Sequence, residues 1–316
     1  MNGLPVGVLG SVGVLGAGAV GQAVAGALVA SGLAADVLIA SRTLEQARAL
    51  AADLDDMRAT LGSPARPRAC LPRDLTACHA LVIAVRARFT NTNQADVRMG
   101  GAAANAPLLR DIARDLVRDH PGVVLVVTNP VDLMTRIVGE HAGHDRVYGV
   151  GSNLDSARYR LLLAHHWRVP AADIRGHVIG EHGDHAVICA STTTVAGHPP
   201  PAPIPLTSIR AALNQRPGRI SSGIGRTRTG PAGAVLAALR HALGDTDGTV
   251  ELCRPWRDGV WLGQPIRFQA GRAEPCLPDL SQQETTQLHA AAAKLAAAFT
   301  ILTTADTKEP AHDAAG

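Results

Sequence analysis

The stretch of sequence that decides the fold is "VGVLGAGAVGQAVAGALVASG", residues 12–32. The pentapeptide VGVLG runs into closely spaced glycines, and an Ala-rich segment follows that ends at Gly32. A buried strand, a tight glycine turn and a helix with a C-terminal glycine cap account for this order. The start of such a helix presents backbone N–H groups and a positive dipole to a phosphate. The residues expected to bind a dinucleotide are Gly16, Gly18, Ala19, Val20 and Gly21.

Further apolar runs continue the pattern through the first half of the chain. Buried parallel strands are expected at 36–40, 80–85 and 123–130, and helices with matching apolar spacing are expected at 43–59 and 105–119. Alternation of this kind predicts an α/β fold in which a Rossmann doubly wound parallel sheet occupies residues 1–152.

The texture of the sequence changes after about residue 152, where we predict a second, α+β substrate domain over residues 153–316. The elements expected there are a helix at 153–167, strands at 174–179 and 186–194, and a final helix from about 281 to 299. The last segment, "TTADTKEPAHDAAG", is expected to be a frayed tail.

Composition excludes several classes of function. The chain has 316 residues, 46% hydrophobic and 18% charged, with a net charge of +3, which is typical of a globular protein. Its two lysines and its scattered arginines form no basic run with interleaved aromatics, so no nucleic-acid partner is expected. Nine glycines interrupt the uncharged first 32 residues, which argues against a membrane span or signal peptide. Five irregularly spaced cysteines without a CxxC pair indicate a reducing cytoplasm and no metal site.

Three short motifs extend the interpretation from binding to catalysis. They are "TNPVD" at 128–132, "NLDSARYR" at 153–160 and "GEHGD" at 180–184. Together with the glycine turn, their order and wording resemble the L-lactate and malate dehydrogenase family over about residues 11–300. The resemblance implies hydride transfer between a nicotinamide cofactor and a small 2-oxo or L-2-hydroxy acid, in a protein that self-associates as a dimer or tetramer.

The resemblance also assigns roles to five residues of this chain. His182 is the proton donor to the substrate ketone, and Asp155 is its partner. A carboxylate fixes the imidazole and favours its charged form, so that a proton is available to a developing alkoxide. Arg158 binds the substrate carboxylate through its planar fork. Arg98 resembles the mobile-loop arginine that polarises the substrate carbonyl, and Asn129 holds the substrate oxygen near the nicotinamide.

The strand at 36–40 lacks the carboxylate with which NAD enzymes bind the ribose hydroxyls, because Ala40 stands where that acid is expected. Ser41 and Arg42 follow it and can donate a hydrogen bond and a positive charge to a 2′-phosphate. The exit of this strand therefore resembles NADP-linked malate dehydrogenases and predicts NADP(H). The alternative is NAD(H) or dual specificity, with Arg42 merely solvated.

Two segments bear on the choice of substrate. The loop from Arg88 to Arg98 is longer than usual and has a neutral tip that includes Thr92, which argues against ordinary malate specificity. The segment "GRTRTGPAG" at 225–233 places Thr227 or Arg228 beside the variable group of the substrate. An inward Arg228 predicts a substrate with a second acidic group, whereas a solvated Arg228 would have no such role.

Three functions remain open from sequence. They are an NADP(H)-dependent 2-oxo acid reductase, an NAD-linked lactate or malate dehydrogenase, and a dinucleotide-binding paralogue without turnover. Residues 40–42 separate the first two, and the intact Asp155, Arg158 and His182 argue against the third. Two departures from the family pattern have no assigned role: Arg86 and His185.

Overall fold

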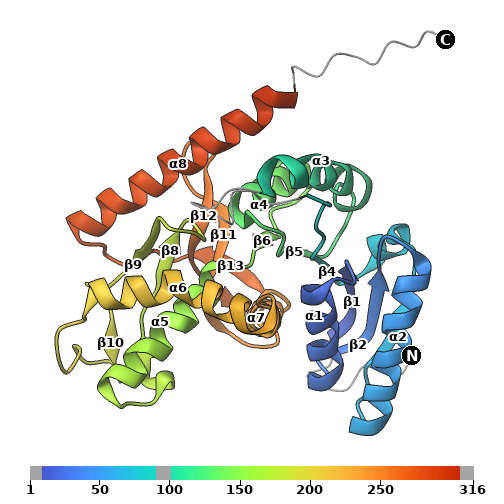
Figure 1. Ribbon diagram of the computed structural model, residues 1–316, viewed down its shortest axis with the longest axis horizontal. Helices are drawn as coiled ribbons and strands as arrows, with labels where there is room; N and C mark the ends of the chain where they lie inside the picture. The colour runs from blue at the N-terminus through green and yellow to red at the C-terminus, as the bar shows by residue number, and fades with distance from the viewer. Residues whose placement is uncertain (1–8, 90–100, 307–316) are drawn as a thin grey trace.

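The computed structural model describes residues 9–89 and 101–306 of the protein (Figure 1). The elements of the N-terminal half are β1 (Leu9–Leu15), α1 (Ala19–Ser31), β2 (Ala34–Ala40), α2 (Leu44–Leu61), β3 (Arg66–Ala69), η1 (Pro72–Ala77), β4 (Ala80–Ile83), α3 (Ala102–Ile112), η3 (Ala113–Val117), β5 (Val123–Val126), α4 (Val131–Gly139) and β6 (Val147–Gly149). Their strands form one parallel sheet in the order β3-β2-β1-β4-β5-β6. The predicted doubly wound Rossmann sheet is confirmed, and its order reverses between β1 and β4, where such folds bind ligands.

Alternate residues of each strand pack against opposite layers of helices. Val82 of β4 faces a core that includes α1, α2 and α7, whereas its neighbours Leu81 and Ile83 face a core that includes α3, α4 and α8. Successive side chains of a strand point to opposite faces, so a strand covered on both sides must be apolar throughout. All four residues of β4 are buried accordingly.

Local signals in the sequence set the ends of the first helices. α1 ends at Gly32, which has φ 62° and donates its N–H to the Val29 carbonyl. Only glycine adopts this left-handed conformation without steric cost. α2 begins after Thr43, whose Oγ1 accepts a hydrogen bond from the Gln46 N–H at 3.2 Å. The βαβ unit predicted from residues 12–40 is therefore built from the expected caps.

The C-terminal half extends the same sheet with antiparallel strands. Its elements are α5 (Ser152–Trp167), η4 (Ala171–Asp173), β7 (Ile174–Arg175), β8 (Val178–Gly180), β9 (Ala186–Ile188), β10 (Thr194–Val195), α6 (Leu206–Ile224), α7 (Thr229–Ala242), β11 (Gly248–Pro255), β12 (Trp261–Gln269), β13 (Arg272–Pro275) and α8 (Gln282–Asp306). β11 pairs with β6, β12 with β11, and β8 and β9 follow beside β12. Figure 1 shows α1 and α2 at one end of the molecule and α5 and β10 at the other. The change from parallel to antiparallel strands falls near residue 152, and the division into two domains there remains a prediction.

Several expected boundaries were wrong. The strands predicted at 174–179 and 186–194 are each split in two, because β7 and β10 pair with each other in a separate small sheet while β8 and β9 join the main sheet. The final helix is longer than predicted, since α8 continues to Asp306 and takes in the first residues of the expected tail. Leu302 is buried there, and its apolar contacts explain why this turn stays helical. Helices α6 and α7 were not predicted.

The membrane and cysteine expectations can be compared with the described residues. Among the helices within residues 9–89 and 101–306, none is both long enough and apolar enough to cross a membrane. The five cysteines all lie in these ranges and are free thiols. Cys253 is fully enclosed, and burial raises the pKa of its thiol well above the usual value. A thiol with a raised pKa stays neutral and unreactive.

Candidate active site

The glycine turn after β1 is closely packed at its ends and open in its middle. Gly16 has φ 116°, and a Cβ there would lie 2.6 Å from the Ala84 carbonyl oxygen. A Cβ on Gly21 would lie 1.7 Å from the Gly16 carbonyl oxygen, so α1 could not approach β1 with any other residue. Gly18, in contrast, has nothing within 4 Å of its Cβ position. The turn therefore combines the close packing and the open space that a pyrophosphate requires.

The backbone around this turn completes an anion site. Ala19 and Val20 are the first residues of α1, where N–H groups have no carbonyl partner within the helix. Gln22 supports the turn because its Nε2 donates to the Ala17 carbonyl at 2.9 Å. The residues present thus fit the diphosphate of a dinucleotide.

The exit of β2 lies directly beside the glycine turn. Ala40 is fully buried, and its carbonyl accepts the Gly16 N–H at 2.8 Å. Ser41 Oγ accepts a hydrogen bond from Ala17 N at 3.4 Å and donates one to Gln46 Oε1 at 2.6 Å. The side chain of Arg42 is exposed. The structure thus brings Ser41 to the turn, with its hydroxyl hydrogen directed at Gln46, and leaves Arg42 accessible from solvent.

The catalytic motifs meet around Asp155, on the first turn of α5. Asp155 Oδ2 lies 2.6 Å from His182 Nδ1, and its Oδ1 accepts a hydrogen bond from Arg158 NH1 at 3.2 Å. The side chains of all three residues are at most 10% exposed, so water screens these interactions weakly. A carboxylate opposite Nδ1 assigns the proton to that nitrogen, which leaves Nε2 to exchange a proton with a substrate. The expected helical spacing of Asp155 and Arg158 is confirmed.

The position of the His182 imidazole is fixed by two further contacts. A Cβ on Gly151 would lie 2.6 Å from His182 Cγ, so the ring packs directly on the backbone that precedes α5. The His182 N–H donates to Asp132 Oδ2 at 2.7 Å. Asp132 is buried at the start of α4, and its burial raises the pKa of this carboxyl to about 6. Asp132 is the last residue of the TNPVD motif. Its hydrogen bond therefore joins that motif to the loop that carries His182.

Asn129 lies at the start of the same motif, where the chain leaves β5. Its side chain is exposed, and its carbonyl accepts a hydrogen bond from Asn105 Nδ2 at 2.8 Å. Asn105 Oδ1 in turn accepts the Ala87 N–H at 2.8 Å. Asn105 is 2% exposed and joins the ends of β4 and β5, which fixes the backbone of Asn129 while its side chain stays accessible.

The remaining predicted residues are less completely placed. Arg98 and Thr92 lie outside the described residues. Thr227 is partly buried and Arg228 is exposed at the N-terminus of α7. α7 is joined to α5 beside the catalytic residues because Asn153 Nδ2 donates to the Ala234 carbonyl at 2.9 Å. The segment 225–233 is thus held near the site, but the exposure of Arg228 removes the premise of a desolvated guanidinium in this structure.

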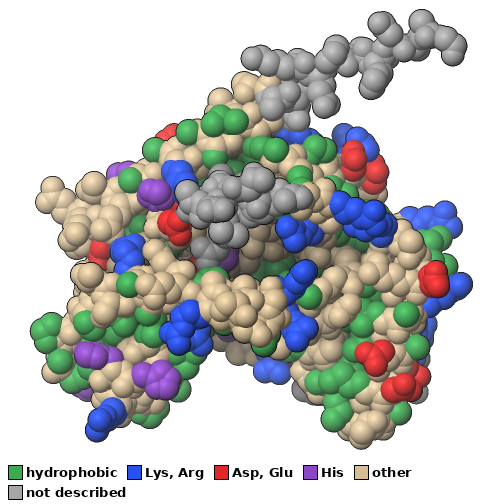
Figure 2. Space-filling view, viewed as in Figure 1, with side chains coloured by type: hydrophobic (Ala, Val, Ile, Leu, Met, Phe, Trp, Pro, Cys, Tyr) green, Lys and Arg blue, Asp and Glu red, His purple; other side chains and the backbone are tan. Residues whose placement is uncertain are grey.

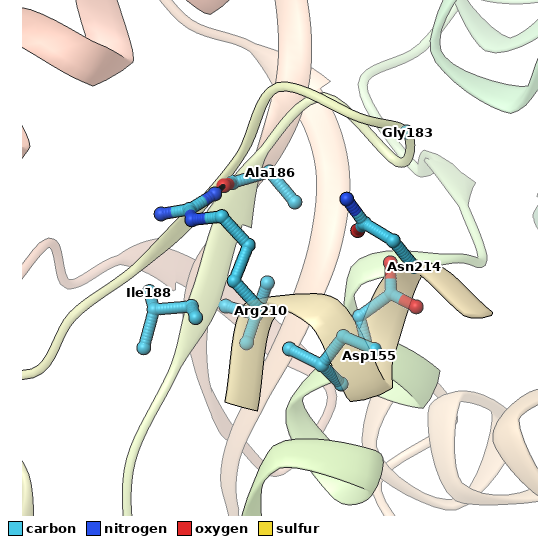
Figure 3. Close-up of a pocket in the computed structure, with 8 residues that line it drawn as sticks. Asp155, Gly183, Ala186, Ile188, Arg210 and Asn214 are labelled. Atoms are coloured by element: carbon cyan, nitrogen blue, oxygen red, sulfur yellow. Dashed lines mark hydrogen bonds between the residues drawn. The ribbon is translucent and has the colours of Figure 1, made fainter. Parts of the chain in front are cut away.

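A pocket at Asp155 is lined by residues of α5, α6, β8 and β9 and of the loop between the two strands (Figure 3). Figure 3 shows Asp155 on α5, Asn214 and Arg210 on α6, and Gly183 on the loop that follows β8. Arg210 NH1 donates to the Ala186 carbonyl at 2.8 Å and so ties α6 to β9. Since α6 was not predicted, its contribution to this pocket was not foreseen either.

Sequence reasoning missed three residues that hold the site together. Asp132 and Asn105 are buried polar residues that support His182 and Asn129. Gln46 binds Ser41 from the next helix. For Asp132 and Asn105 the available signal was a polar residue within an otherwise apolar stretch, which only a hydrogen-bonded position tolerates, whereas the exposed Gln46 carried no such signal. Within residues 9–89 and 101–306, no three His, Cys, Asp or Glu side chains gather as a metal site would require.

The parallel sheet with its glycine turn is typical of a dinucleotide-binding α/β protein, and the buried His–Asp pair lies in the half of the chain that follows this sheet. A family model described as the lactate/malate dehydrogenase, NAD binding domain, matches residues 11–150. The L-lactate dehydrogenase of Thermus aquaticus is 32% identical over 312 residues, which cover 92% of this chain and 99% of that protein. The chain belongs to the lactate/malate dehydrogenase family.

Two further comparisons show how much of this chain is similar to other known proteins. The L-lactate dehydrogenase of Zea mays is 34% identical over 194 residues, and this match spans 60% of the chain and only 54% of that relative. The crystal structure of Cryptosporidium parvum malate dehydrogenase superposes with a TM-score of 0.86 at 21% identity, covering 94% of this chain and all of that one. At this identity the superposition shows the fold alone.

Proposed function

We propose that the protein is an NADP(H)-dependent reductase that converts a small 2-oxo acid into an L-2-hydroxy acid. The observation that carries the proposal is the 2.6 Å contact between His182 Nδ1 and Asp155 Oδ2 beside the buried Arg158. The proposed proton donor and the proposed carboxylate-binding residue thus both contact Asp155. The family membership supports this activity, because the relatives named above are lactate and malate dehydrogenases.

The reduced nicotinamide, His182 and Asp155 each have a separate role in the proposed reaction. The reduced nicotinamide, when bound, supplies the hydride. His182 donates a proton from Nε2 to the substrate oxygen as negative charge develops there, and Asp155 stabilises the imidazolium before transfer. Oxidation of the alcohol runs the same steps backwards, with His182 as the base.

Arg158 orients the substrate by binding its carboxylate. Its ion pair with Asp155 Oδ1 holds the guanidinium in one position. A guanidinium fork can bind both oxygens of a carboxylate and so fix the plane of the 2-oxo acid. In Figure 2, Lys and Arg side chains lie around the central part of the face that is drawn. Their positive charge suits an anionic substrate and cofactor.

The preference for NADP(H) is inferred from the exit of β2. A buried Ala40 replaces the acid that would repel a 2′-phosphate, and the exposed Arg42 can pair with that phosphate. The matching family model is described as an NAD binding domain, so NAD(H) is the alternative cofactor.

Replacing Ala40 with Asp should reverse or strongly reduce the preference for NADPH over NADH. A carboxylate would then face the 2′-phosphate, and repulsion of about 1–4 kcal/mol corresponds to about fivefold to a thousandfold in the ratio of kcat/KM values. The matched control is Ala40→Asn, which adds nearly the same volume at this buried position without the charge. A natural protein that already favours NADH, or equal ratios in the two variants, would show that this strand exit does not select the cofactor.

The substrate class is inferred from the segment before α7. Arg228 is the N-cap residue of α7, a helix that is tied to α5 near Asp155. Its side chain is exposed, so the proposal rests on pairing with an anionic group of the substrate and not on a buried charge. We therefore propose a 2-oxo acid with a second acidic group, such as a carboxylate, phosphonate or sulfonate.

Arg228→Ala should lower kcat/KM for oxaloacetate and phosphonopyruvate while leaving pyruvate nearly unaffected. Loss of one exposed charge pair costs up to about 1 kcal/mol, or roughly fivefold, and more if the substrate excludes water. Exposed Arg226, two residues away, gives the control variant Arg226→Ala. An unchanged ranking of the substrates in Arg228→Ala would remove Arg228 from the specificity site without touching the family assignment.

Two rival functions remain distinguishable. An NAD-linked lactate or malate dehydrogenase would show the same pH dependence and need the same active-site residues, but it would use NADH. A paralogue without turnover would bind a dinucleotide but oxidise none with any 2-oxo acid. Self-association as a dimer or tetramer and a cytoplasmic location stay predictions.

A further inference from the structure

A buried carboxylate that the reaction does not use directly precedes the catalytic histidine. The side chain of Glu181 is 3% exposed, at the point where β8 ends and the histidine loop begins. A buried carboxylate is costly unless it is paired and hydrogen-bonded. Its partners therefore indicate why it is kept there.

One oxygen of Glu181 holds its own loop. Oε2 accepts the His185 N–H at 3.1 Å and lies 3.3 Å from His185 Nδ1. A Cβ on Gly183 would lie 2.7 Å from Glu181 Cδ, so the loop folds closely over the carboxylate. The loop of residues 181–185 is thus closed around the Glu181 side chain, and His182 sits within it.

The other oxygen of Glu181 joins the loop to the last helix. Oε1 lies 2.7 Å from Nζ of Lys294, which extends from α8. α8 packs against β8 and β9, and Leu288 and Ala291 lie near Gly180. The chain contains only two lysines among 30 Lys and Arg residues, and one of them makes this contact. An ammonium is compact enough to meet a single carboxylate oxygen, whereas a guanidinium is a wide planar fork.

We propose that Lys294 and Glu181 are positioning residues for His182. Lys294 compensates the charge of Glu181, and Glu181 holds the loop so that the imidazole meets Asp155. The inference rests on the proposed reductase function for its kinetic consequence. It also assigns a role to His185, whose N–H closes the loop.

The charged groups around this loop come from four elements. Asp155 faces His182 from α5 and is itself paired with Arg158, Asp132 faces His182 from α4, Lys294 faces Glu181 from α8, and His185 belongs to the loop itself. Asp132 holds the His182 N–H and Asp155 holds Nδ1, so these two contacts fix one residue. Glu181 fixes the backbone on both sides of that residue, which the other two contacts do not do.

The first test is the variant Lys294→Met, measured by steady-state kinetics with NADPH. It should lower kcat by about 10- to 100-fold, since a displacement of a reacting group by about 1 Å has an effect of this size. The KM for the cofactor should stay unchanged, because β1, which precedes the glycine turn, is separated in the sheet order from β8 and β9, against which α8 packs. Lys294→Arg should keep more activity than Lys294→Met, and Glu181→Gln combined with Lys294→Met should recover part of the loss because no charge is left unpaired.

The second test does not depend on turnover. Hydrogen–deuterium exchange should become faster in Lys294→Met for the peptide spanning residues 181–188, with exchange of the glycine turn unchanged. Arg114→Met is the control, since it removes a cation that pairs with Asp111 at the surface. A kcat within twofold of the natural value with unchanged exchange would overturn the proposal, as would an equal loosening of the whole chain. If the natural protein shows no reductase activity, the exchange measurement alone decides.

Discussion

Replacing His182 with Ala is expected to lower kcat by about 10²- to 10⁴-fold, the usual contribution of a positioned general acid. The imidazole is the group that Asp155 holds at 2.6 Å, and alanine offers no proton at that place. Binding of NADPH should persist, because the glycine turn lies at the other end of the site. Stopped-flow or steady-state assays of 2-oxo acid reduction, with a separate measurement of NADPH affinity, would test this.

A companion variant is Asp155→Asn, which keeps the shape of the residue that contacts His182 and removes its charge. It should also lower kcat, because the imidazolium loses its stabilising carboxylate. A His182→Ala protein with a kcat near the natural value would show that the proton comes from another group. The mechanism would then be wrong even if the cofactor bound normally.

Arg158→Lys is expected to reduce kcat/KM for every 2-oxo acid by about 10- to 100-fold. The variant keeps the positive charge but replaces a planar fork with a point charge. A hydrogen bond to a charged group contributes about 1.5–3 kcal/mol, which sets this range. Most of the effect should lie in KM for the 2-oxo acid, while the KM for NADPH stays constant.

Arg160→Lys is the matched control on the same helix. Arg160 NH1 pairs with Glu251 at 3.1 Å, away from Asp155, so this variant should leave the kinetics nearly unchanged. If Arg158→Lys instead lowers thermal stability and leaves kcat/KM intact, Arg158 serves only to hold Asp155. Substrate binding would then have to be assigned to another cation.

The parts of the fold that sequence predicted are those with strong local signals. Gly16 and Gly32 have a positive φ and Gly21 allows the close approach of α1 to β1, so the spacing of these glycines specifies the βαβ unit. The apolar strands of the parallel sheet are buried on both faces and are therefore continuous in sequence. The strands β7–β10 are only two or three residues long, which is too short for a clear apolar pattern, and the sequence does not indicate that they divide between two sheets.

In the candidate site, too, contacts between residues near in sequence could be predicted and contacts between distant residues could not. Asp155 and Arg158 lie three residues apart on one helix, which sequence can predict from helical geometry. Contacts such as that of Lys294 with Glu181 link residues 113 positions apart, and only the folded chain brings them together. The support that Asp132 gives to His182 was missed for the same reason, although Asp132 stands within a recognised motif, because that contact links residues 50 positions apart.

The most direct test of the account is an absorbance assay of the natural protein with NADPH and NADH against a panel of 2-oxo acids. The panel should include pyruvate, oxaloacetate, phosphonopyruvate and branched acids. The account predicts oxidation of NADPH that depends on a 2-oxo acid, with a higher kcat/KM than for NADH and a preference for a substrate with two acidic groups. A protein that binds the dinucleotide but oxidises neither cofactor with any of these acids would contradict it.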